Sequence, residues 1–453
     1  MVSTRTGSSK LPEGVERDDN RIIAVVTGAN SGFGLGICHQ LLSNLSLAPG
    51  SKIPVSEPQL TALPPSLRSD PHLFTQDDDD EDEEKEIDYD NPPTLTLILA
   101  CRSEKKANEA INILLERHEK DLKNRREKGE IIRKGWKENL RTVYEQLDLD
   151  NPGSGSGVLG FCQRLKERYP HITTLYLNAG MGAFSGIDGM ECLKQHVTDG
   201  LSHAQSQPNY QLEIKGAKSS DGERGIVWGT NVLAPYIMVK ELIPLLRRSP
   251  LNLPFEPRII YTSSLTSSFS KLSIKDPLND YQLLQYEKSY SASKIMFDLI
   301  MVQFDKEYGS STKNENDNEN ERQVRCFTTD PGCVCTNFFS SGMGVILWWA
   351  NVKFFFYWLS FYLCRLLGST HHPVYADQGA LPMIYAALIS NKFLSPSSKN
   401  PAQRFCVISE RWGKTKVGFE EVDQWEKGDE LGKGFMEACE SHRKEWKRRE
   451  GLE

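Results

Sequence analysis

The sequence predicts an α/β protein with a single doubly wound parallel sheet of about seven strands and helices on both faces. Short apolar, β-branched runs alternate with longer segments of helical character, which is the pattern of a parallel sheet. The runs are IIAVV (22–26), TLTLILA (94–100), TVYEQLDL (142–149), TTLYLN (173–178), RIIYTSS (258–264), VRCFTT (324–329) and RFCVIS (404–409). Their spacing over 453 residues favours one large domain rather than two.

Polar segments set the expected domain limits. We expect a disordered tail at 1–20, a domain at 21–410 and a charged extension at 411–453. A disordered insert at 46–92 interrupts the domain, and it contains DDDDEDEEKE, with nine acids and one lysine. Blocks of like charge usually remain solvated, and a docking segment is the alternative use of this insert. The net charge of −7 resides in that run, and no basic stripe indicates nucleic-acid binding.

Ten cysteines are scattered along the chain without a CxxC pair or a histidine cluster at ligand spacing. This distribution favours free thiols in a reducing compartment. No metal site is predicted.

A glycine-rich turn follows the first strand. The segment TGANSGFGLG places Gly28, Gly32 and Gly34 between that strand and a helix expected to begin near Leu35. Glycines at such a turn let backbone amides approach a pyrophosphate, and the helix N-terminus supplies positive potential. The context predicts a dinucleotide site.

Together with LNAG (177–180) and PGCVCT (331–336), this turn resembles the short-chain dehydrogenase/reductase family. The resemblance implies a Rossmann-type fold and a nicotinamide cofactor. It also implies cofactor contacts at Gly28, Asn30, Ser31, Gly32, Phe33, Gly34, Asn178, Ala179, Gly180, Pro331, Gly332, Val334 and Thr336.

The identity of the cofactor is predicted from the end of the second strand. Arg102 stands there, where an enzyme that uses NAD would carry an acid. A guanidinium suits a 2′-phosphate by charge and geometry, so NADPH is favoured over NADH. The alternative is a solvated arginine at a helix start. The resemblance further implies that Asp148 meets the adenine amino group.

Candidate catalytic groups lie in SYSASK (289–294), where Tyr290 and Lys294 are one helical turn apart. A neighbouring ammonium is expected to lower the pKa of the tyrosine and suit it to proton transfer, and Lys294 is also expected to hold the nicotinamide ribose. By resemblance, Ser264 polarises the substrate carbonyl and Asn231 connects Lys294 to solvent. The 26 positions between Ser264 and Tyr290 indicate an inserted loop at 268–280.

Residues 179–236 more specifically resemble the fungal 3-keto-steroid reductases of sterol C-4 demethylation, through GID (186–188), PNY (208–210) and NVLAPY (231–236). This implies NADPH-dependent reduction of a 4-methyl 3-ketosterol to the 3β-alcohol. It also implies a location on the cytosolic face of the endoplasmic reticulum membrane or on lipid droplets, with other enzymes of the pathway as partners. The alternatives are a reductase of another lipid carbonyl, such as a retinoid, and a catalytically silent scaffold.

A hydrophobic segment within 340–368 carries nine aromatic side chains between Trp348 and Tyr362. Its core, 345–363, is long enough to span a bilayer, but Lys353 interrupts it and a span would separate the last strand from the sheet. Dense Trp and Tyr suit the membrane interface. We therefore expect a membrane-surface anchor that also covers the substrate; a buried core or dimer helix is the alternative.

Overall fold

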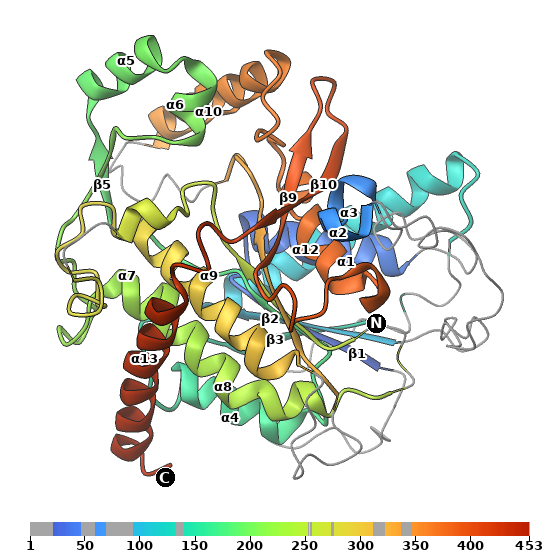
Figure 1. Cartoon of the computed structure of the whole chain (residues 1–453). Coiled ribbons are helices and arrows are strands. Elements are labelled where there is room, and N and C mark those ends of the chain that lie inside the picture. The colour runs from blue at the N-terminus through green and yellow to red at the C-terminus, as the bar shows by residue number, and fades with distance from the viewer. Residues whose placement is uncertain are drawn as a thin grey trace.

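Strand β1 (Arg21–Thr27) lies inside an eight-stranded sheet of order β10-β9-β8-β7-β4-β1-β2-β3 (Figure 1). The other strands are β2 (Thr94–Cys101), β3 (Leu140–Gln146), β4 (Thr174–Leu177), β7 (Arg258–Thr262), β8 (Arg325–Asp330), β9 (Gln403–Ser409) and β10 (Thr415–Glu421). All pairs are parallel except β9 with β10, which is antiparallel. The predicted fold class is confirmed, and the chain order reverses direction between β1 and β4.

This computed structural model describes residues 21–46, 59–68, 94–132, 137, 140–251, 253, 256–272, 276–310, 322–336 and 347–452. The expected tail at 1–20 and the acidic run at 77–86 lie outside these ranges.

Helices cover both faces of the sheet because its central strands are apolar on both sides. One core packs beneath α1 (Gly32–Leu45), α3 (Glu104–Glu127) and α12 (Leu381–Leu388), and the other beneath α4 (Val158–Arg168), α8 (Ala234–Arg247) and α9 (Ser289–Tyr308). Shorter elements are η1 (Leu60–Ala62), α2 (Pro65–Arg68), α7 (Ile226–Trp228), the π-helical turn η3 (Gly229–Leu233), η4 (Phe269–Leu272), α11 (Ala376–Gly379) and η6 (Asn391–Phe393).

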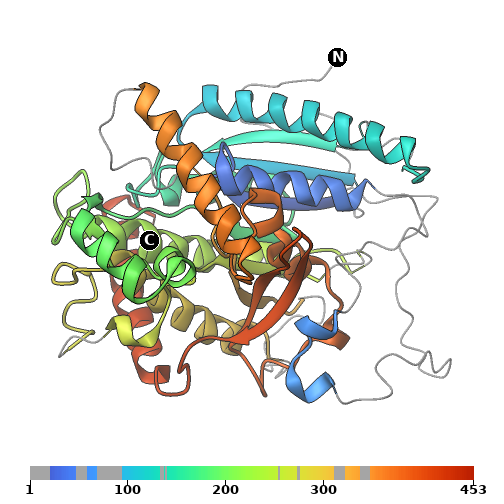
Figure 2. The same ribbon diagram turned by 90° about the horizontal axis from the view of Figure 1, so that it is seen from above.

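A small lobe stands above the carboxyl ends of the strands. It consists of the two-stranded sheet β5 (Phe184–Ile187) and β6 (Gln211–Glu213) with α5 (Gly189–Thr198) and α6 (Leu201–Ser206). Helix α10 (Leu347–Leu366), the predicted hydrophobic segment, lies beside α5 and α6 in both Figure 1 and Figure 2. The chain thus places its hydrophobic helix next to the lobe.

Two expectations about the margins of the domain need correction. The predicted extension at 411–453 forms β10 and α13 (Asp429–Arg449), and α13 packs against α9 through buried Phe435 and Cys439. The insert is ordered at 59–68, because Gln59 and Thr61 hydrogen-bond the backbone of Val417 on β10 at 2.9 and 2.6 Å. Sequence periodicity could not reveal either contact, since each joins segments far apart in the chain.

Within the described part of the chain, one helical segment, Ile226–Arg247, is long and apolar enough to cross a membrane. Most of it, 83% of its most apolar window, is buried in the fold.

Candidate active site

A cavity of about 920 Å³ opens at the carboxyl ends of the parallel strands, where open α/β sheets bind their ligands. It brings together all of the residues predicted from the sequence as cofactor contacts, and three of the four candidate catalytic groups, Ser264, Tyr290 and Lys294. The fourth, Asn231, is buried directly behind its wall. The predicted nucleotide and catalytic motifs therefore share one site.

The glycine turn has the backbone geometry that the motif requires. Gly28 and Gly32 have φ of 68° and 52°, which disfavour residues with a side chain. A Cβ on Gly34 would lie 2.4 Å from the carbonyl oxygen of Gly28, so the turn can close only around glycine. Helix α1 begins at Gly32, three residues earlier than expected, with its N-terminus at the cavity.

The Asn178–Gly180 turn is attached to the end of β1. The hydroxyl of Thr27 accepts hydrogen bonds from the backbone N–H groups of Asn178 and Ala179, both at 2.9 Å. The Asn178 amide donates to the Thr27 carbonyl at 2.9 Å. These bonds fix the second predicted cofactor segment relative to the glycine turn.

Arg102 and Asp148 occupy the other end of the cavity, just past β2 and β3. The side chain of Arg102 is exposed. The Asp148 carboxylate accepts a hydrogen bond from the backbone N–H of Asp150 at 3.2 Å.

The segment from Pro331 to Thr336 crosses the cavity toward the glycine turn. Its turn at Gly332 has φ of 68°, and the Gly332 N–H donates to the Asp330 carboxylate at 2.9 Å. Thr336 reaches Gly32, where a Cβ would lie 3.4 Å from the Thr336 Cβ. The three predicted cofactor segments thus line one continuous surface.

Tyr290 and Ser264 meet through their side chains, which are hydrogen-bonded. Tyr290 stands in the first turn of α9, and Ser264 follows β7. Phe184 of the lobe packs on the Tyr290 ring at a centroid distance of 5.7 Å. The pair therefore lies where the sheet, helix α9 and the lobe converge.

Burial raises the pKa of Tyr290, and the hydrogen bond with Ser264 opposes this effect. The predicted net lowering of this pKa is not met. The Lys294 ammonium lies 5.6 Å from the centroid of the Tyr290 ring, and its Nζ donates instead to the Thr262 carbonyl at 2.7 Å. For Tyr290 the loss of hydration on burial outweighs the opposing hydrogen bond with Ser264.

Lys294 and Asn231 flank Gly180. A Cβ on Gly180 would lie 3.5 Å from the Lys294 Nζ and 3.1 Å from the Asn231 Oδ1. Asn231 sits in the π-helical turn η3, and its amide is held by the backbone of Met181, at 2.7 and 2.8 Å, and by Ser293 at 2.9 Å. Such single-turn π segments often occur at functional sites.

Several groups at the site escaped the sequence analysis. Glu213 on β6 contacts the first turn of α9, and the rings of Tyr210, Tyr357 and Phe361 line the cavity from the lobe and α10. Only the aromatic density of α10 gave a signal for them. The described residues of the loop predicted at 268–280, which are 268–272 and 276–280, do not line the cavity. Tyr281, next to this loop, meets His442 of α13 at 3.0 Å.

Comparison with known proteins identifies the family. No family model matches the chain. A 3-keto-steroid reductase from Eremothecium gossypii is 30% identical over 269 residues, which cover 59% of this chain and 67% of that protein. The chain belongs to the 3-keto-steroid reductase family. The predicted recognition is confirmed, and the chain is an oxidoreductase.

Other members of the 3-keto-steroid reductase family align over greater lengths. Those of Kluyveromyces lactis and Saccharomyces cerevisiae are each 26% identical, over 88% and 89% of this chain and 89% and 90% of theirs. Among solved structures, salutaridine reductase from Papaver somniferum has 17% identity and a TM-score of 0.45, covering 83% of this chain and 98% of its own. L-sorbose reductase from Gluconobacter frateurii has 14% identity and a TM-score of 0.40, covering 84% and 95%.

Proposed function

We propose that this protein is an NADPH-dependent reductase that converts a 4-methyl 3-ketosterol into the 3β-alcohol during sterol biosynthesis. The observation that carries the proposal is the shared cavity. A nucleotide-binding turn, a Ser–Tyr–Lys group and an aromatic roof line the same space. The names of the relatives supply the steroid class.

The residues present fit NADPH along one side of the cavity. The glycine turn and the N-terminus of α1 offer backbone amides to the pyrophosphate. Arg102 would meet the 2′-phosphate, and Asp148 the adenine. The Asn178–Gly180 turn and Pro331–Thr336 would hold the ribose and the nicotinamide. When bound, NADPH supplies the hydride.

The protein's own groups manage the ketone oxygen and the proton. Ser264 and Tyr290, already hydrogen-bonded to each other, would both bind that oxygen and hold the carbonyl in place. Tyr290 would donate its proton as negative charge develops on the oxygen. Lys294, as the buried cation beside this ring, would stabilise the resulting phenolate, and Asn231 would support reprotonation from solvent.

The substrate side of the cavity is apolar and aromatic. Tyr357 and Phe361 of α10 line this space together with Tyr210 and Phe184 of the lobe. A flat, apolar ring system would fit between these surfaces with its ketone at Ser264 and Tyr290. Such a pocket uses its few polar groups to fix orientation.

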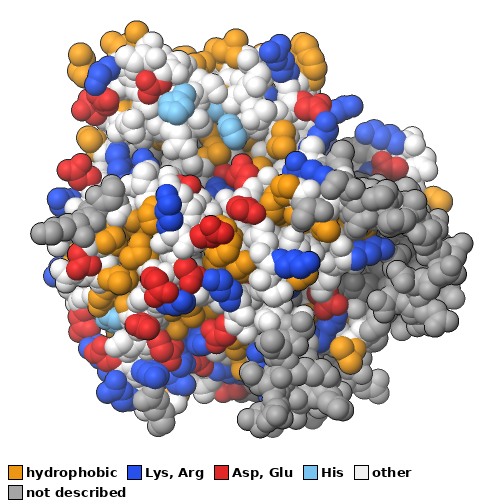
Figure 3. Space-filling view, in the orientation of Figure 1, with side chains coloured by type: hydrophobic (Ala, Val, Ile, Leu, Met, Phe, Trp, Pro, Cys, Tyr) orange, Lys and Arg blue, Asp and Glu red, His pale blue; other side chains and the backbone are white. Residues whose placement is uncertain are grey.

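The outer face of the lobe and α10 supports docking on a membrane. Met190, Leu193 and Val197 of α5 are 77%, 63% and 77% exposed. Exposed apolar residues of α10 lie at the same end, namely Phe355, Phe356, Leu359 and Leu363. In Figure 3 orange side chains gather at the upper rim, over these helices. A sterol dissolved in the bilayer of the endoplasmic reticulum, or in a lipid droplet, would enter beneath α10 without crossing water.

The test is NADPH oxidation in detergent micelles with a 4-methyl 3-ketosteroid, comparing the wild type with Tyr290→Phe. We expect the wild type to form the 3β-alcohol and Tyr290→Phe to lose turnover while it still binds NADPH. If the wild type reduces a retinoid aldehyde but no 3-ketosteroid, the substrate is a retinoid and not a sterol. Turnover by Tyr290→Phe would refute its role as acid, and a wild type that binds NADPH without turnover would favour a scaffold.

A further inference from the structure

A buried arginine behind the active site contacts three of its segments. Arg404 lies on β9, a strand that is otherwise largely apolar, and only 4% of its surface is exposed. Its Nη2 donates to the Ser264 carbonyl at 2.9 Å and to the Asp330 carboxylate at 2.9 Å. Its Nη1 lies 3.6 Å from the carboxylate of Asp298.

Each of these partners adjoins a group with a proposed role. Ser264 binds the ketone oxygen through its hydroxyl. Asp330 precedes the Pro331–Gly332 turn and holds it through the Gly332 N–H at 2.9 Å. Asp298 lies one turn beyond Lys294 on α9 and accepts hydrogen bonds from two hydroxyls of the Ser264 loop, both at 2.6 Å, namely those of Ser263 and Ser267. One guanidinium therefore joins the serine loop, the cofactor turn and the catalytic helix.

The planar, multivalent geometry of the guanidinium is what these contacts use. The buried carboxylates of Asp298 and Asp330 and a carbonyl oxygen surround it from three elements, and a third carboxylate, that of the more exposed Glu420, lies 3.6 Å from its Nε. A lysine would keep the charge but present a single point to these acceptors. Buried ion networks are weak evidence for stability, because apolar residues of similar size often serve as well. Specific positioning is therefore the better account of this arginine.

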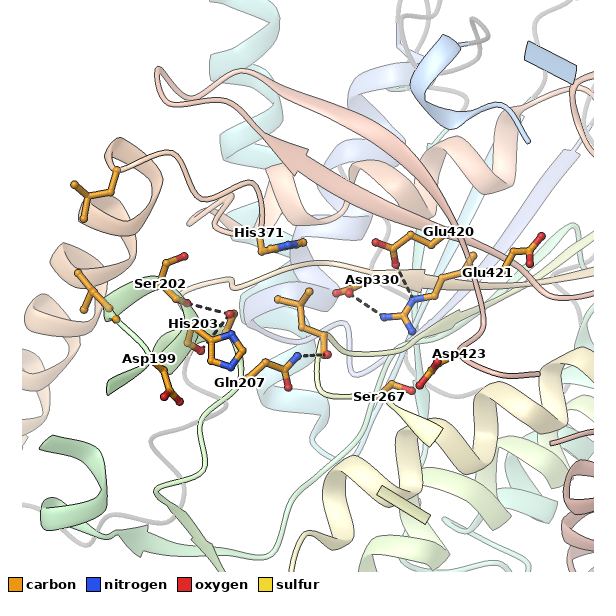
Figure 4. A pocket seen from close by; sticks show the side chains of 16 residues that line it. Asp199, Ser202, His203, Gln207, Ser267, Asp330, His371, Glu420, Glu421 and Asp423 are labelled. Carbon is orange, nitrogen blue, oxygen red and sulfur yellow. Dashed lines mark hydrogen bonds and ion pairs between the residues drawn. The ribbon is translucent and has the colours of Figure 1, made fainter. Parts of the chain in front are cut away.

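Arg404 lines a second hollow, of about 770 Å³. Figure 4 shows Asp330 and Glu420 on its wall, each joined by a dashed line to the same guanidinium. Gln207, also labelled there, donates to the Leu265 carbonyl at 2.6 Å. Successive carbonyls of the serine loop are thus held from two different elements, which leaves the loop little freedom to shift.

We propose that Arg404 is a positioning residue for the reduction: it fixes the Ser264 loop and the Pro331–Gly332 turn relative to the catalytic helix. This inference rests on the proposed function for the roles of those segments. Arg404 does not touch the reacting atoms. It acts through Ser264, Asp330 and Asp298.

The experiment compares Arg404→Lys and Arg404→Met with Glu420→Gln in the full chain. Glu420 is the matched control, because it contacts the same guanidinium, at 3.6 Å, from a side chain that is 42% exposed. Thermal unfolding, NADPH affinity by fluorescence, and kcat and KM for the 4-methyl 3-ketosteroid are measured for each.

We expect Arg404→Lys to fold and to lose about tenfold to hundredfold in kcat, since small displacements of positioning groups have effects of this size. KM for the ketone should stay within about threefold, whereas NADPH affinity should fall by about threefold or more as the Pro331–Gly332 turn moves. Glu420→Gln should remain within about twofold of the wild type in both constants, because its contact is exposed and screened.

A folded Arg404→Lys with wild-type kcat would overturn the inference, as would an equal loss in Glu420→Gln. Failure of both Arg404 variants to fold would also overturn it, because the residue would then serve stability. If the wild type reduces no 3-ketosteroid, the proposed function is wrong, and NADPH affinity then tests the role of Arg404 on its own. Weaker NADPH binding in the Arg404 variants would support the positioning role, and unchanged binding would refute it.

Discussion

The carboxylate of Glu213 accepts a hydrogen bond from the backbone N–H of Tyr290 at 2.9 Å. The same oxygen accepts from the Ser289 hydroxyl at 2.7 Å, so a residue of the lobe caps the first turn of α9. A carboxylate is favourable there because the first N–H groups of a helix lack partners within it. Lys288 strengthens this contact between the lobe and α9 by donating hydrogen bonds to the backbone carbonyls of Asn209 and Gln211.

Glu213→Ala should therefore lower kcat by about tenfold, since the start of α9 and the Tyr290 hydroxyl would lose their fixed position. NADPH affinity should change little, because the Glu213 carboxylate binds the start of α9. Steady-state kinetics with a fluorescence titration would measure both. Glu191→Ala is the control in the same lobe, because its carboxylate pairs only with exposed Lys194 among the described residues. Equal activity in the two variants would contradict the coupling.

The activity should fall as the pH rises through about 8. Burial lowers the pKa of Lys294 to about 8, and the neighbouring Asp298 partly opposes this effect. The ammonium is the form proposed to stabilise the phenolate, so the active form is present below that pH and is lost above it. A pH profile of kcat/KM would show this fall in activity as a descending limb on the alkaline side.

Asp298→Asn should move the same limb to lower pH, because the carboxylate that favours the ammonium is removed while an amide oxygen can still accept from Ser263 and Ser267. Glu307→Gln on the same helix is the control, since its carboxylate pairs with Lys240 near the surface. A limb that stays in place in Asp298→Asn would show that another group titrates.

Arg102→Ala should weaken NADPH far more than NADH. A charge-assisted hydrogen bond contributes about 1.5–3 kcal/mol, so we expect the KM for NADPH to rise by about tenfold or more. The KM for NADH, which has no 2′-phosphate, should change by less than about twofold on the same reasoning. Lys105→Ala, three positions along the chain, controls for a general loss of positive charge. Parallel losses with both nucleotides would reject the assignment.

The triple variant Met190→Asp, Leu193→Asp, Val197→Asp should detach the protein from phospholipid vesicles. Each side chain is more than half exposed, and burying apolar surface in the interface is favourable by about 25 cal/mol per Å². Cosedimentation with phosphatidylcholine vesicles would measure binding. Ile113→Asp on α3, 53% exposed on another helix, is the control. If the triple variant still binds the vesicles, α5 is not part of the membrane-binding surface.

Much of the fold could be predicted because its signals are local. Strand β1 and the glycine turn carry their information within a few residues: an apolar run, then glycines where φ must be positive. The same holds for Tyr290 and Lys294, which helical spacing alone places on one face. Motifs of this kind depend on backbone geometry that only certain residues permit.

What could not be predicted depends on contacts between distant segments. Glu213 meets Tyr290, and Arg404 meets Ser264, across long stretches of chain, and no periodic pattern reports such pairs. Weak signals existed in two places: Arg404 is a charge within a predicted buried strand, and Asp298 is an acid one turn after Lys294. Strand β10 was not predicted, because an antiparallel edge strand alternates polar and apolar residues and so lacks a continuous apolar run.

The packing of α13 against α9 has a consequence for how the protein is made. Helix α9 receives its outer cover only after the ribosome has translated the chain from Tyr308 to Asp429 and beyond. At typical elongation rates this delay is on the order of ten seconds, during which the surface around Leu299, later covered by Gly428 and Gly432, is exposed to solvent. We expect the nascent chain to need chaperone protection in that interval, and the reductase domain to mature only after its synthesis is nearly finished.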